Sequence, residues 1–169
     1  MKTWRIAVIC MMVFLVSISC KAVTGNTESE NTNTLTESTE VTSDTSLPVP
    51  NPGGLITKVT LAHDSTPENF DPIDPTTKFN QGDTIHAIVA VKQAPAGTRF
   101  SVKWLTIDVG EKEKADYLID TTETEQGGSG NLDFTLSPDG KFMVGTYRVE
   151  IYVNGKLDQL KIYSIVAGK

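Results

Sequence analysis

Short stretches of alternating hydrophobic and polar residues make up the second part of this chain, residues 55–169. Alternation with a period of two places every second side chain on one face, as in a half-buried β-strand. No long stretch repeats its hydrophobic residues at the helical period of about 3.6 residues. The pattern therefore predicts an all-β domain with strands at residues 56–61, 84–92, 99–107, 117–122, 131–136, 146–153 and 156–166.

The last two of these strands form the best-specified pair. Asn154 and Gly155 lie between them, and this dipeptide favours a two-residue hairpin because a type I′ turn needs positive φ at both central positions. A regular hairpin with this turn pairs Val149 with Leu160, two apolar residues. The register predicted by the pattern therefore places odd-numbered residues of strand 146–153 in the core.

The opposite face of this hairpin is the candidate binding face. Aromatic and arginine side chains on an exposed sheet face are typical of surfaces that bind a protein or a sugar. The same residues also fit ordinary cross-strand pairs, which contribute about 0.2–1 kcal/mol each. The residues expected on this face are Arg148, Tyr152, Leu157, Lys161 and Tyr163.

Two aromatic residues give the predicted domain a family resemblance. Trp104 lies in the middle of a strand, and Tyr147 follows Gly145 near the start of the penultimate strand. They resemble the buried tryptophan and the tyrosine corner of immunoglobulin-like domains. The resemblance implies a single antiparallel β-sandwich of about seven strands over residues 55–169. The cysteine bridge of that fold is missing, as expected of its bacterial variants, since Val149 stands two positions after Tyr147.

The first twenty residues have the layout of an export signal. Lys2 and Arg5 precede an apolar run at residues 6–18, which is too short for a membrane-spanning helix. The run ends in small residues before Cys20 and resembles the lipobox of bacterial lipoproteins. This implies a signal peptide at residues 1–19, acylation of Cys20 with a fatty acid such as palmitate, and an extracytoplasmic domain anchored to the cell or outer membrane. A conventional secreted protein and a short uncleaved anchor remain alternatives.

Residues 20–54 are expected to be a disordered linker. Between Lys21 and Ser46, 12 of 26 residues are Thr or Ser, and most of the others are polar. Such a segment cannot bury enough apolar surface to offset the ordering of its backbone, about 1–2 kcal/mol per residue. A proline-rich piece and two glycines follow it. The linker would hold the domain away from a membrane.

Composition excludes several functions. The formal net charge of -6 argues against nucleic acid as a partner, because such binding depends on Lys and Arg neutralising phosphates. Both cysteines, Cys10 and Cys20, precede the domain, so it has no disulfide, no cysteine-ligated zinc and no cysteine nucleophile. His63 and His86 have no partner at metal-ligand spacing and are expected to face solvent.

An acidic loop is the remaining candidate for chemistry. Its carboxylates could bind calcium weakly, as extracellular modules do, although their spacing is not that of an EF-hand. Three prolines in the same loop also explain it as a rigid, solvated connection. The candidate ligands are Asp64, Glu68, Asp71 and Asp74.

These patterns together predict a membrane-anchored lipoprotein with a non-catalytic, immunoglobulin-like binding or adhesion module. No cofactor is expected, calcium apart. The expected partners are the membrane, through the N-terminal lipid, and a protein or glycan that the sequence does not identify. Three alternatives are an accessory subunit docking on an extracytoplasmic complex, a carbohydrate-binding module and, least favoured, a small hydrolase.

Overall fold

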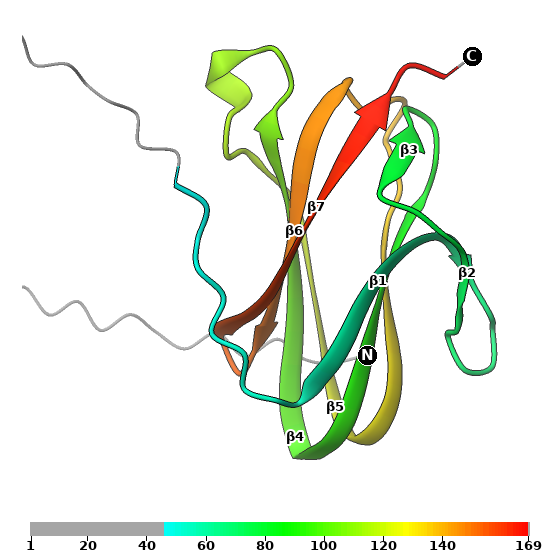
Figure 1. The fold of residues 1–169 in the computed structure, drawn as a ribbon, viewed down its shortest axis with the longest axis vertical. Helices are drawn as coiled ribbons and strands as arrows, with labels where there is room; N and C mark the ends of the chain where they lie inside the picture. Colours follow the sequence, from blue (N-terminus) through cyan, green and yellow to red (C-terminus); the bar gives the residue numbers. More distant parts are fainter. Residues whose placement is uncertain (1–45, 169) are drawn as a thin grey trace, which may run out of the picture. The chain divides into compact units, whose positions relative to one another are not determined.

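Seven β-strands and one short 3-10 helix make up the computed structural model, which describes residues 46–168 (Figure 1). The expected signal peptide, Cys20 and most of the linker lie outside the described residues. No helix among the described residues is long and apolar enough to cross a membrane. The elements are β1 (Ile56–Ser65), β2 (Pro72–Pro75), β3 (Lys78–Asn80), β4 (Ile85–Asp108), η1 (Lys112–Lys114), β5 (Leu118–Leu136), β6 (Gly145–Val153) and β7 (Lys156–Val166).

The long antiparallel pair of β4 and β5 organises the fold, and Figure 1 shows these two strands side by side along the domain. The first half of β4 also pairs with β1, and its second half pairs with β6. The strand order is β2-β1-β4-β6-β7-β3, with β5 on β4, and β3 runs parallel to β7. The all-β class is therefore confirmed, in the form of one mixed sheet of seven strands.

Two pairs of predicted strands are each one continuous strand in the structure. β4 covers the predicted strands 84–92 and 99–107 except Thr84, and β5 covers 117–122 and 131–136 except Tyr117. The turn signals between them, around Pro95 and Gly128, lie instead at register shifts within the β4–β5 ladder. Bulges let a ladder continue past residues that would otherwise end it. Thr98 stabilises β4 next to these register shifts, because its hydroxyl donates a hydrogen bond to the carbonyl of Pro95 at 2.7 Å.

One hydrophobic core joins both halves of β4. Ile85, Val89, Phe100, Val102 and Trp104 are each 0% exposed and belong to a single apolar cluster. These residues alternate along β4, as a period of two requires. The burial predicted for Trp104 is therefore confirmed.

The predicted register of the β6–β7 hairpin is wrong beyond its tip. Ile151 pairs with Gln159 and Tyr152 pairs with Leu157, so Asp158 is an extra residue in a β-bulge. The Asp158 side chain is 2% exposed and accepts a 2.5 Å hydrogen bond from the backbone N–H of Gly53. A polar group that satisfies its hydrogen bonding in this way makes the bulge tolerable, and the period-two pattern alone does not reveal it.

The bulge reverses the faces of β7. Tyr147 now pairs with Tyr163, which is 2% exposed, whereas Val149 pairs with the exposed Lys161. Tyr163 stacks on Tyr147 with 5.4 Å between ring centroids and lies within the core. Tyr163 was expected on the outer face, and this placement corrects that expectation.

Candidate functional site

The structure does not bring the five residues of the predicted binding face onto one exposed surface. Arg148 is 6% exposed and Tyr163 lies in the core. Tyr152 and Leu157 are half-buried, and only Lys161 is exposed. The outer side of β6 is instead occupied by a buried network of charged groups.

Arg148 is the centre of this network. Its Nε donates to Glu150 Oε1 at 2.7 Å, and its Nη1 donates to Asp116 Oδ1. The Tyr152 hydroxyl donates to the other oxygen of Glu150 at 2.6 Å. Burial lowers the pKa of Arg148, but the hydrogen bonds to Asp116 and Glu150 outweigh burial and raise it overall. Burial, the hydrogen bond to Glu150 and the negative charge of Glu150 raise the pKa of Tyr152 to about 12.

Through Asp116 this network fixes the loop of residues 109–117, which contains η1. Thr106 fixes the same loop from the end of β4. Its hydroxyl donates to the carbonyl of Lys114 and accepts the N–H of Tyr117 at 3.0 Å. The loop is therefore attached at two points, one ionic and one neutral.

A second segment, residues 141–145, is fixed opposite this loop. Gln81 binds Phe142 by its side-chain amide and by its carbonyl, at 2.8 and 2.9 Å. The Tyr147 hydroxyl donates to the carbonyl of Met143 at 2.7 Å, which is the contact expected of a tyrosine corner. Gly145 lies so close to β4 that a Cβ would be 2.2 Å from the carbonyl oxygen of Asp108, so only glycine fits there.

Between the two segments lies a groove of about 290 Å³, named here the Tyr117–Phe142 groove. Three large apolar or aromatic side chains are strongly exposed in or beside its two segments: Tyr117 at 59%, Leu118 at 46% and Val144 at 49%. The groove is lined by Thr106, Lys114, Tyr117, Ile119, Lys141, Phe142, Met143 and Tyr147.

The lining of this groove is mostly apolar. The lining contains no carboxylate, histidine or cysteine, and its buried threonine hydroxyl already bonds the loop backbone. Binding pockets for small molecules are mostly apolar with a few polar groups. A larger hollow of about 810 Å³ beside β3 is lined mainly by polar residues and small residues of the chain end. The Tyr117–Phe142 groove is thus the better candidate site.

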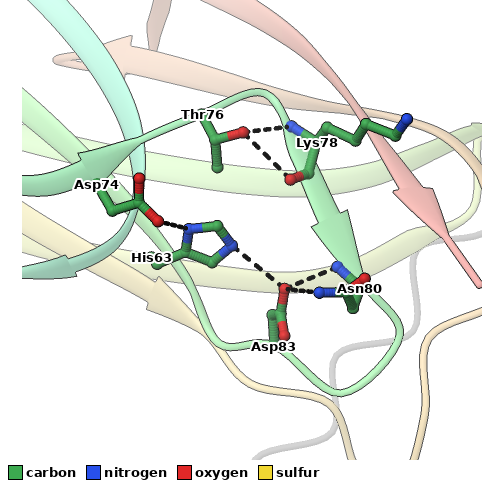
Figure 2. A network of polar contacts seen from close by, with 6 residues as sticks. All are labelled: His63, Asp74, Thr76, Lys78, Asn80 and Asp83. Carbon is green, nitrogen blue, oxygen red and sulfur yellow. Dashed lines mark hydrogen bonds and ion pairs between the residues drawn. The ribbon is translucent and has the colours of Figure 1, made fainter. Parts of the chain in front are cut away.

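Both histidines are half-buried and contact aspartate carboxylates, contrary to the prediction that they face solvent. His63 Nδ1 lies 2.9 Å from Asp74 and its Nε2 lies 3.3 Å from Asp83 (Figure 2). Asp83 also accepts the backbone N–H of Asn80 at 2.7 Å. The His63 ring packs edge-on against Phe79 at 5.1 Å between centroids. This network joins β1 to β2 and to the β3–β4 connection.

The second histidine belongs to a similar structural contact. Asp133 Oδ2 lies 2.8 Å from His86 Nδ1 and accepts the hydroxyl of Ser65 at 2.7 Å. In a catalytic triad the histidine stands between serine and aspartate, and here the aspartate takes that position. The serine is therefore not activated as a nucleophile.

The acidic loop shows no convergence on a metal ion. Asp71 accepts an amide hydrogen of Asn131 at 3.1 Å, Asp74 contacts His63, and Asp64 caps the N–H of Ser65 at 2.8 Å. Within residues 46–168 no three His, Cys, Asp or Glu side chains are placed to hold one ion. Calcium binding by Asp64, Glu68, Asp71 and Asp74 stays a prediction without geometric support.

Comparison with known proteins yields remote structural likenesses, of which one is described here. No protein-family model matches the chain, and neither does any curated protein. A solved structure of the alkylpurine DNA glycosylase AlkC of Pseudomonas fluorescens, bound to DNA with an abasic site analog, is 13% identical. The match covers 64% of this chain and 30% of that one, with a TM-score of 0.35. A likeness this weak carries no argument for fold or function.

Two predictions are withdrawn after this comparison, whose match is a DNA glycosylase bound to DNA. The binding or adhesion module, with its docking-subunit and carbohydrate-binding alternatives, also loses the exposed face on which it depended. The exclusion of nucleic acid as a partner is withdrawn as well. That exclusion relied on net charge, which is a sum over the chain and does not describe any local surface.

Sequence patterns missed the groove. Lys114 lies in a run of alternating charges, residues 111–114, that is typical of a loop, and Tyr117 and Ile119 fell in the predicted strand 117–122. The available signal was the apolar pair Phe142 and Met143, which stands between glycines outside any predicted strand. An apolar pair outside any strand must pack against other elements, and here Phe142 joins the core while both residues line the groove.

Proposed function

We propose that the Tyr117–Phe142 groove receives a small hydrophobic molecule and that the chain is not an enzyme. The observation that carries this proposal is an apolar groove whose two sides are both held in place. Thr106 and Asp116 hold one side, while Gln81 and Tyr147 hold the other. A site formed before binding loses little conformational freedom when a ligand enters.

Burial of apolar surface would supply the affinity. Tyr117 offers an exposed ring, and Ile119, Met143 and Phe142 continue the apolar surface into the groove. Each Å² of apolar surface removed from water contributes about 25 cal/mol. A compact aromatic or branched molecule matches the size of this groove, which is near the lower end for ligand sites.

A neutral fluorescent probe tests this proposal. Phenylnaphthylamine, whose fluorescence rises in apolar surroundings, is titrated into the intact protein and two variants. Ile119→Ala removes a side chain that lines the groove, and we expect it to weaken binding several-fold. Ile162→Ala makes the same change at an exposed β7 residue outside the groove and serves as control. Absence of saturable binding, or equal losses in both variants, would refute the proposal.

Within the all-β class we propose an immunoglobulin-like sandwich, and the strand pairing supports this assignment. β1 and the second half of β5 flank the first half of β4, while β6 and the first half of β5 flank its second half. The buried Trp104 and the Tyr147 contact to Met143 agree with that family. A superposition of an experimental structure on known immunoglobulin-like domains would test this assignment.

Export and acylation at Cys20 form a separate part of the proposal. They are supported by the basic start, the apolar run and the small residues that precede Cys20. Labelled palmitate should be incorporated into the protein, and Cys20→Ser should abolish the label. Incorporation that survives Cys20→Ser would overturn acylation at this residue.

A further inference from the structure

Resting on the proposed function, we infer that the ligand of the Tyr117–Phe142 groove is an amphipathic anion, an apolar body with one carboxylate or similar acidic group. The inference comes from the charged residues around the groove. Two lysines, Lys114 and Lys141, line it, and no carboxylate does. In a chain with 21 acidic and 15 basic residues, such a lining is a local reversal of the overall charge.

Lys141 is the better of the two anion partners. It is exposed, and its ammonium group lies more than 4 Å from every carboxylate in the part of the chain that the structure describes. An ammonium group without a carboxylate partner can bind an incoming acid without first breaking an ion pair. It also adjoins Phe142, so the anion would lie beside an aromatic wall.

Lys114 is placed to assist. Its Nζ lies 3.1 Å from Glu111 and 3.3 Å from the sulfur of Met143, which lines the groove. The ion pair between Lys114 and Glu111 is weak, because both side chains are about half exposed to solvent. The acidic group of a ligand would compete with Glu111 for the ammonium group of Lys114, whereas at Lys141 it would displace no carboxylate.

The surroundings of the groove indicate where the ligand lies. A neighbouring hollow of about 330 Å³ shares Ile119, Lys141 and Phe142 with the groove, but Asp120 and Asp139 line it as well. These two carboxylates repel an anion. The ligand is thus expected in the Tyr117–Phe142 groove, between Lys114 and Lys141, and not in the acidic hollow beside it.

Two probes with the same aromatic body separate this inference from the proposed function. Anilinonaphthalene sulfonate carries an acidic group that phenylnaphthylamine lacks, so the ratio of their affinities measures the contribution of the charge. We expect the intact protein to bind the sulfonate several-fold more tightly. Lys141→Gln should lower sulfonate affinity by about three- to tenfold, the range of a partly exposed ionic contact, and should change the affinity of the neutral probe much less.

Lys156→Gln supplies the matched control. It removes the same charge at the tip of the β6–β7 hairpin, at the opposite end of β6 from the groove, and should leave both affinities unchanged. If both probes bind equally, or if the two lysine variants lose sulfonate binding to the same extent, the anion inference is wrong and the proposed function stands. If neither probe binds saturably, the proposed function fails, and the inference fails with it.

Discussion

Two polar networks at different depths attach peripheral segments to this domain. The Arg148 network ties the loop of residues 109–117 to β6, and its Arg148 and Glu150 side chains are 7% and 5% exposed. The His63 network ties β2 and the β3–β4 connection to β1, and its His63 and Asp74 side chains are 34% and 74% exposed. Both networks join a nitrogen side chain to carboxylates at hydrogen-bond distance, but their surroundings differ.

The difference in depth decides what each network contributes. Removing one member of a buried pair leaves an uncompensated charge away from water, which costs about 3–5 kcal/mol. An exposed pair is screened by solvent and contributes about 0.2–1 kcal/mol. The buried Arg148 network therefore contributes more to the free energy of unfolding. The exposed His63 network mainly fixes the position of β2 and of the β3–β4 connection against β1.

The largest expected effect comes from Arg148→Ala. The substitution leaves Glu150 buried without its cation and releases Asp116, so we expect the free energy of unfolding to fall by about 3–5 kcal/mol. Urea denaturation measures it. Replacing Glu150 by Gln in the same chain should recover part of the loss, because no buried charge then remains. Equal stability of the single and double variants would contradict this reading.

Thr106→Val should have the next largest effect. The two side chains have nearly the same shape, but valine leaves the carbonyl of Lys114 and the N–H of Tyr117 without their partner. The expected loss is about 1–3 kcal/mol in the free energy of unfolding. Faster amide exchange should appear in residues 109–117 and not in β1. Uniform exchange across the domain would show that Thr106 does not anchor this loop.

Alkaline pH provides a third test. The pKa of Tyr152 is raised to about 12, while an unfolded tyrosine ionises near 10. The folded state therefore keeps its proton where the unfolded state releases it, and stability falls as pH rises from 10 to 12. Tyr147 and Tyr163 also have raised pKa values and contribute in the same direction. Tyr152→Phe should reduce the slope of unfolding free energy against pH without abolishing it, and an unchanged slope would be contrary evidence.

The smallest expected effect comes from His63→Gln. Glutamine keeps a hydrogen-bonding side chain but cannot reach Asp74 and Asp83 with two ring nitrogens as the imidazole does. At this solvent-exposed site the free energy of unfolding should fall by about 0.2–1 kcal/mol, measured by urea denaturation. A loss as large as that of Arg148→Ala would remove the contrast between the two networks.

Much of the strand pattern was predictable from the sequence, because the buried residues of a strand, such as Phe100, Val102 and Trp104, are apolar residues at every second position. The joining of predicted strands into β4 and β5 was not, since a bulge uses the same glycines and prolines as a turn. Nor was the bulge at Asp158, whose partner Gly53 lies 105 residues away. The candidate site was the least predictable part of the structure. It depends on how Arg148, Thr106 and Gln81 hold two segments that no periodic pattern describes.

Mapping backbone amide shifts during titration with anilinonaphthalene sulfonate tests the central claim most directly. If the Tyr117–Phe142 groove is the binding site, the saturable shifts will concentrate in residues 114–119 and 141–147. Shifts spread over the outer side of β6 and β7, or none that saturate, would contradict it.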